Sequence, residues 1–158
     1  MRHTSLAYDI ARELRDIELE SLALATRGHA LMASGQTASA KGCHEEAAAL
    51  TLGGGVGPEH GGYVLCSVIT SAVNRGDWGC AGQWSEQFTR WCERFGVSAY
   101  PGLCQLHRAE VLHFKGDLTQ ALTQIEQAVR ILKEAAPWAE GDAWRVLGDV
   151  QCAQGDLK

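Results

Sequence analysis

Apolar positions along the chain follow the 3.6-residue period of helices, and the helical segments repeat. The repeat is marked by four glycines, Gly35, Gly76, Gly116 and Gly155, at spacings of 41, 40 and 39 residues. An alanine follows five residues after each of the first three, at Ala40, Ala81 and Ala121. Self-similarity at such a period predicts stacked supersecondary units.

The two anchor types suit a pair of helices joined by a tight turn. Glycine is favoured where the first helix ends, because the residue after the helix adopts a positive φ. The alanine, and small residues such as Gly28 and Gly148 seven positions before the glycine, would let the two helices approach closely. Asp77, Asp117 and Asp156 follow three of the glycines and are expected to cap the next helix.

The expected elements are eight helices in a single domain that spans residues 1–158. Their predicted ranges are 4–15, 17–34, 37–51, 61–75, 78–95, 102–115, 118–134 and 139–154. Connectors are expected at 53–62, 96–101 and 134–140, which hold the three prolines, Pro58, Pro101 and Pro137. The fold class is therefore all-α, a right-handed solenoid of antiparallel helix pairs. Its repeats cover roughly 17–52, 61–96, 101–135 and 139–158, with half repeats at both ends.

The pattern resembles the tetratricopeptide repeat, whose usual period is 34 residues, and three runs resemble a narrower group. They are YVLCSVITSAVNRGDWGCAGQWSEQFTRWCE, YPGLCQLHRAEVLHFKGDLTQAL and APWAEGDAWRVLGDVQCAQGDL, the last with the W-x-x-L-G run from Trp144 to Gly148. They are similar to the helical-repeat region of large bacterial LuxR-type transcriptional regulators, which typically lies between an ATPase module and a DNA-binding helix-turn-helix. The resemblance implies a sensing or assembly scaffold. It implies no ATP hydrolysis, because the G-x-x-x-x-G-K-[ST] phosphate loop is absent from this sequence.

Charge and composition narrow the expected partners. The formal net charge is −5, whereas direct nucleic-acid binding needs a basic face. The six cysteines show no C-x-x-C spacing and follow no secretory signal, which is typical of reduced cysteines in a cytoplasmic protein. No apolar run reaches the length of a membrane helix. We expect a protein partner or a small effector, or a second copy of the chain, and neither a membrane nor a cofactor.

The first helix of each pair is expected to line the concave surface of a solenoid, where a ligand would bind. Taking the phase from the glycines, the inward positions are His29, Met32, Tyr63, Cys66, Thr70, Asn74, Glu110, His113, Arg145 and Asp149. The set mixes aromatic, polar and charged groups, as recognition grooves do. An ordinary solvated face would show the same mixture.

Other motifs admit a second interpretation. The glycine-rich run 52–62 could cradle a phosphate, but no Lys or Arg accompanies it, which favours a flexible loop. Cys66, Cys104, His107 and His113 could serve a metal- or thiol-dependent enzyme, although packed cysteines are commoner. Neither a metal site nor catalysis is expected.

Self-association is the structural alternative to ligand binding. Half repeats at the two ends could stack end to end. Trp84, Phe88 and Trp91 could instead share one helix face that pairs with a second copy, although core packing is the commoner role of such residues.

Overall fold

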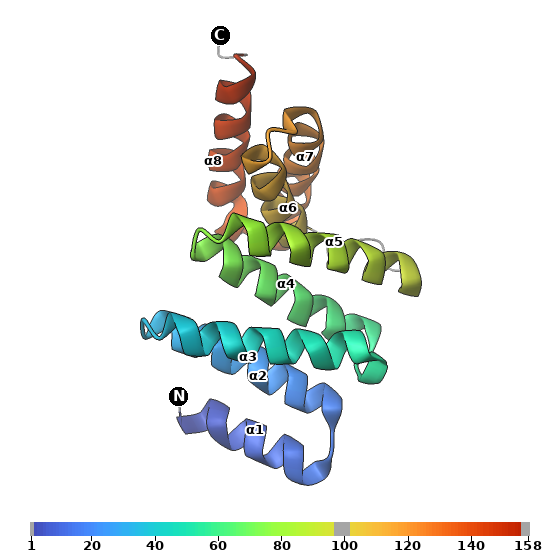
Figure 1. The fold of residues 1–158 in the computed structure, drawn as a ribbon. Coiled ribbons are helices and arrows are strands. Elements are labelled where there is room, and N and C mark those ends of the chain that lie inside the picture. Colours follow the sequence, from blue (N-terminus) through green and yellow to red (C-terminus); the bar gives the residue numbers. More distant parts are fainter. Residues whose placement is uncertain (1, 97–101, 156–158) are drawn as a thin grey trace. The chain divides into compact units, whose positions relative to one another are not determined.

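The computed structural model describes residues 2–96 and 102–155, and within these ranges the chain is all-α, with eight α-helices and no strand (Figure 1). The helices are α1 (Arg2–Leu14), α2 (Ile17–Ala33), α3 (Thr37–Leu50), α4 (Pro58–Asn74), α5 (Trp78–Phe95), α6 (Leu103–Phe114), α7 (Leu118–Ala135) and α8 (Pro137–Gln154). A short π-helical turn, η1 (Thr51–Gly55), follows α3. The bounds lie within a few residues of those predicted from the apolar period.

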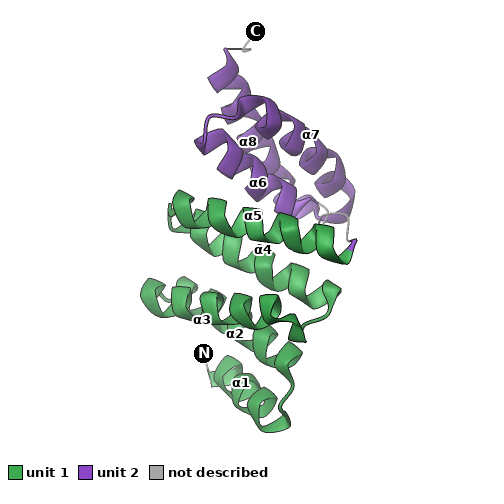
Figure 2. Cartoon of the chain, turned by 45° about the vertical axis from the view of Figure 1, so that its right-hand side comes forward, with its two compact units in different colours: residues 1–95 green, residues 96–158 purple. Residues whose placement is uncertain are grey.

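The helices fall into two compact units, residues 1–95 and 96–158 (Figure 2). In the first unit α2 packs against α1, α3 and α4, and α5 packs against α4. In the second unit each of α6, α7 and α8 contacts the other two.

All four anchor glycines end a helix in the left-handed conformation that the repeat predicts. The φ angles of Gly35, Gly76, Gly116 and Gly155 are 77°, 70°, 81° and 79°. After the first three glycines, the next residue donates its N–H to a carbonyl five positions back, as Asp77 does to Ala72 at 3.0 Å and Asp117 to Leu112 at 3.0 Å. This is the Schellman arrangement, which satisfies the last carbonyls of the helix.

The helix after each turn begins where the sequence predicts. The Asp77 carboxylate accepts the N–H of Cys80 at 3.1 Å, and the Asp117 carboxylate accepts that of Gln120 at 3.1 Å. Gln36 stands at the equivalent place before α3 without a side-chain cap bond. The cap predicted at Asp156 lies outside the described residues. The three alanines five positions after the glycines, Ala40, Ala81 and Ala121, are all fully buried.

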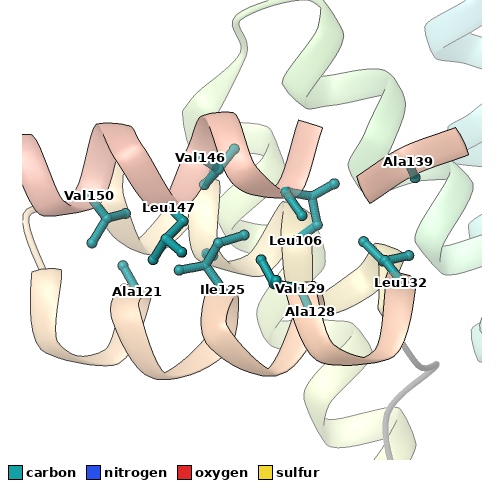
Figure 3. Close-up of a cluster of buried hydrophobic side chains, with 12 residues drawn as sticks. Leu106, Ala121, Ile125, Ala128, Val129, Leu132, Ala139, Val146, Leu147 and Val150 are labelled. Atoms are coloured by element: carbon teal, nitrogen blue, oxygen red, sulfur yellow. The ribbon is translucent and has the colours of Figure 1, made fainter. Parts of the chain in front are cut away.

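The core of the second unit lies where the apolar stripe of α7 meets α8 (Figure 3). Ile125 and Leu132 on α7, and Val146 and Val150 on α8, are at most 1% exposed. Burying side chains of this size contributes about 1.5–3 kcal/mol each. The apolar residues that recur every 3.6 positions in 118–135 therefore form a face that is buried in the structure.

The connectors are shorter than the sequence predicts. Helix α4 begins at Pro58, inside the glycine-rich run, and Gly61 is a buried helical residue. Proline fits the first helical position because its missing N–H would have no partner there. Pro137 likewise opens α8, so Ala136 alone separates α7 from α8. Pro101 and most of the predicted 96–101 connector lie outside the described residues.

One predicted close approach is not made. A Cβ placed on Gly148 would meet no atom within 4 Å, and the Trp144 side chain is 54% exposed. The expectation of a close helix approach at Gly148 is therefore wrong within the described residues, although Leu147 of the same W-x-x-L-G run belongs to the buried core of the second unit. Gly28, the equivalent position of α2, does face a neighbour: a Cβ there would overlap the His44 ring on α3.

Candidate functional site

Four of the predicted binding residues line one cavity in the first unit. His29 and Met32 come from α2, and Thr70 and Asn74 from α4. Together with Ala33 and Ser71 they surround about 360 Å³. We call this cavity the α2–α4 groove. Its residues meet because α2 packs directly against α4.

Equivalent repeat positions supply both walls of the groove. His29 and Thr70 are 41 residues apart, as are Ala33 and Asn74. The same spacing separates the first two anchor glycines. Residues at equivalent repeat positions therefore lie side by side in the structure. Their convergence could be predicted from the repeat period, without any recognisable motif.

No acidic side chain, Lys or Arg lines the groove, so its polarity comes from neutral groups. The Thr70 hydroxyl donates to the Cys66 carbonyl at 2.9 Å, which leaves its oxygen lone pairs as acceptors. The Ser71 hydroxyl oxygen accepts from Arg75 at 2.6 Å. With the Asn74 amide and the Met32 thioether, the groove offers hydrogen-bonding groups beside an apolar wall.

His29 stands against a second, buried imidazole. Its ring lies edge-on to that of His44, with the centroids 5.1 Å apart. Burial lowers the pKa of His29, although its side chain still reaches solvent. Burial first, and then repulsion from His29, lowers the pKa of His44 to about 4. Both rings are therefore neutral at pH 7, which keeps this wall of the groove uncharged.

His44 is the largest feature of this region that the sequence prediction missed. Its side chain is 2% exposed, and neither ring nitrogen makes a well-aligned hydrogen bond within the described residues. The ring lies directly over Gly28, where any Cβ would displace it. The sequence did hold one indication of a buried histidine. In the apolar stripe of 40–47, His44 occupies the repeat position that Ile125 occupies in the helix pair α6–α7.

Tyr63 and Cys66 do not line the groove. Both lie nearer the start of α4, where Tyr63 is 42% exposed and Cys66 is partly buried. The groove is formed by the last turns of α2 and α4. The predicted face is therefore longer than the cavity.

The remaining predicted residues belong to the second unit, where three of them form a charged network. Arg145 donates to Glu110 at 2.9 Å and to Asp149 at 3.1 Å. His107 Nδ1 lies 3.0 Å from the other Glu110 oxygen. His113, also on α6, is not part of this network. The groups pair mainly with one another, so the network fastens α6 to α8.

The network also sets the ionisation of Glu110. Burial opposes its charge, but hydrogen bonds from His107 and Arg145 outweigh burial and hold the pKa of this carboxyl below its usual range. Glu110 in turn raises the pKa of the Arg145 guanidinium. Both groups are therefore charged across the physiological range.

The alternative metal and phosphate sites gain no support from the geometry. Within 2–96 and 102–155, no three His, Cys, Asp or Glu side chains are grouped to hold a metal ion. In the glycine-rich run, the Gly57 N–H already donates to the Glu18 carboxylate at 2.7 Å. The other Glu18 oxygen lies 2.7 Å from His60 Nδ1. A carboxylate of the chain itself thus occupies the place proposed for a phosphate.

The cysteines differ in state. Cys43, Cys80, Cys92 and Cys152 carry free thiols. The expectation of reduced cysteines holds for these four and is wrong for Cys66 and Cys104, whose sulfurs are not free thiols.

The tryptophan face of α5 is mostly core. Trp91 is 3% exposed and lies over Gly61, and Phe88, which stacks on it, is 6% exposed. A contact with a second copy is therefore contradicted for Phe88 and Trp91, which pack in the core. Trp84 is partly exposed and lines a second cavity of about 620 Å³ between α3 and α5, with Lys41 and Glu45 opposite.

Comparison with protein-family models, with curated proteins and with solved structures finds no match for this chain. The resemblance to LuxR-type regulators therefore stays a prediction. None of the helices within the described ranges combines the length and apolar character needed to cross a membrane.

Proposed function

We propose that this chain is a protein- or effector-binding helical-repeat scaffold whose ligand site is the α2–α4 groove. The observation that carries the proposal is the convergence of His29, Met32, Thr70 and Asn74 around one cavity. Ligand sites are concave, with an apolar lining and a few well-placed polar groups. The groove combines these properties.

The lining favours an uncharged ligand. A charged group would lose its hydration without finding a partner of opposite charge, which costs several kcal/mol. A neutral molecule, or a neutral segment of a protein, can instead donate to the Thr70 oxygen, pair with the Asn74 amide and place an apolar group against Met32. The proposed ligand is therefore a neutral molecule or segment with both amide-like and apolar parts.

In this proposal the repeats form a right-handed solenoid of antiparallel pairs, of the tetratricopeptide type. The glycine turns, the capping aspartates and the buried alanines support it, because each recurs at the same phase of the repeat. The ligand would act by binding one arrangement of the helix pairs more tightly than another, since only differential affinity shifts such an equilibrium. The scaffold would be the sensing region of a LuxR-type regulator, or a stand-alone relative, located in the cytoplasm and not itself an enzyme.

A thermal-shift screen of the chain with neutral and charged small molecules and peptides tests the groove. We expect neutral hits whose effect is lost in Asn74→Ala and His29→Ala. The matched control is Gln83→Ala, which removes an exposed amide on α5. Hits confined to charged compounds, or hits that survive both groove substitutions, would contradict the proposal.

The regulator assignment has its own test. The coding sequence on either side of this segment should encode an ATPase module or a DNA-binding helix-turn-helix. Finding neither would favour the stand-alone scaffold.

A further inference from the structure

Three large aliphatic side chains form an exposed row on α1. Leu6, Ile10 and Leu14 are 56%, 45% and 66% exposed. Their spacing of four residues places them along one side of the helix. We call this row the α1 ridge. A contiguous exposed apolar row of this kind marks an interaction surface.

A groove lies directly beside the ridge, between α1 and α2. It encloses about 520 Å³. Small side chains lie among its lining residues, at Ala7, Ala11 and Ala23. Its larger apolar residues are Ile10, Leu19 and Leu22. Because Ile10 belongs to both the α1 ridge and this α1–α2 groove, the two features face the same side of the unit.

We infer that this face binds the same face of a second copy of the chain and forms a two-fold dimer. Ligand binding in the proposed α2–α4 groove does not depend on this dimer. The ridge is symmetric about Ile10, so two antiparallel α1 helices would bring Ile10 against Ile10 of the partner subunit. Leu6 would then meet Leu14 of the partner subunit. A two-fold interface must be self-complementary, and a row with Ile10 at its centre and a leucine four residues to either side meets that condition.

Charge favours a second copy over the other occupants of an apolar face. On α1, Arg2 and Arg12 balance Asp9 and Glu13. Two such helices do not repel one another, although each chain carries a formal net charge of −5. An anionic lipid surface would gain nothing from this balanced helix and would be repelled by the chain as a whole.

The size of the α1 surface determines how tightly the two copies are expected to associate. A 13-residue helix is about 20 Å long, so the interface belongs to the small end of specific protein interfaces. We therefore expect a dimer that dissociates in the micromolar range.

Sedimentation velocity over a wide concentration range tests the inference. The wild type should pass from monomer to dimer as its concentration rises. Ile10→Glu and Ile10→Lys should each weaken association by about tenfold or more, because like charges would face one another across the axis. Mixing these two variants should restore the dimer, since opposite charges then meet. Trp138→Glu, which changes a still more exposed apolar residue of α8, is the control and should associate as the wild type does.

Three results would overturn the inference. The first is that the wild type remains monomeric at every concentration, whether or not it binds phosphatidylcholine vesicles. The second is that Ile10→Glu associates as strongly as the wild type. The third is that the mixture of Ile10→Glu and Ile10→Lys stays monomeric. Circular dichroism checks that the variants fold, and Leu6→Gln gives a milder second variant that should also weaken association. Asn74→Ala should leave the dimer intact, so failure of the ligand groove and failure of the dimer are distinguishable.

Discussion

The His44 ring of α3 lies against the backbone of Gly28 on α2, so closely that no side chain fits between them. An ideal Cβ on Gly28 would lie 2.6 Å from Cε1 and 2.7 Å from Cδ2 of that ring. Gly28 occurs seven residues before the first anchor glycine, and Gly148 occupies the same place before the last. The two glycines share a phase of the repeat but differ in surroundings, which makes them a matched pair for experiment.

Gly28→Ala should destabilise the first unit, and Gly148→Ala should not. Alanine normally stabilises a helix by about 1 kcal/mol relative to glycine. At Gly28 the overlap with His44 outweighs this gain, and we expect a net loss of about 1–3 kcal/mol. Urea denaturation of both variants measures the difference. Equal effects at the two positions would contradict the packing described here, and adding His44→Ala to Gly28→Ala should recover part of the loss.

His44 should make stability depend on pH. Its pKa is about 4 in the folded chain and 6.5 ordinarily, so the unfolded chain binds the extra proton between these values. Stability from this group is complete above about pH 6.5 and is lost as the pH falls towards 4, by about 3 kcal/mol.

Comparing the wild type with His44→Phe isolates the titration of His44 together with its coupling to His29, because all carboxylates titrate in both proteins. The difference in the free energy of unfolding should change steadily between pH 6.5 and 4. A constant difference over that range would show that His44 is not buried as a neutral ring.

The missing cap of α3 offers a stabilising change. Gln36 has φ −86° and ψ 62°, close to the −83° and 71° of Asp117, yet only Asp117 caps its helix. Gln36→Asp should therefore form the same bond and add about 0.5–1 kcal/mol. Asp117→Ala should remove a similar amount. Thermal unfolding of the two variants measures both changes, and a Gln36→Asp protein no more stable than the wild type would refute the comparison.

The network of the second unit can be tested by titration. Removing the guanidinium in Arg145→Met should raise the pKa of Glu110, because one of the two hydrogen bonds that oppose the effect of burial is lost. Side-chain NMR of Glu110 follows the change. Arg130→Met, an exposed arginine on α7 outside the network, is the control and should leave Glu110 unaltered. An unchanged pKa in Arg145→Met would show that the pair does not form in solution.

The helices and the groove were predictable because both follow from period. Glycine spacing located the turns at Gly35, Gly76 and Gly116, and the same period paired His29 with Thr70. The start of α4 was missed because glycines at 61 and 62 are typical of loops, whereas Pro58 begins a helix in which Gly61 admits the close approach of Trp91. The close approach at Gly148 was wrongly predicted because period alone cannot tell whether a neighbouring helix covers a given position.

Mapping a bound ligand by NMR tests the central claim most directly. With a neutral ligand from the screen, the largest backbone amide shifts should cluster at 29–33 on α2 and 70–74 on α4. Only small changes are expected at Trp84 on α5 and Arg145 on α8. Shifts centred on the α3–α5 cavity or on α8, with the α2–α4 groove unperturbed, would contradict the account.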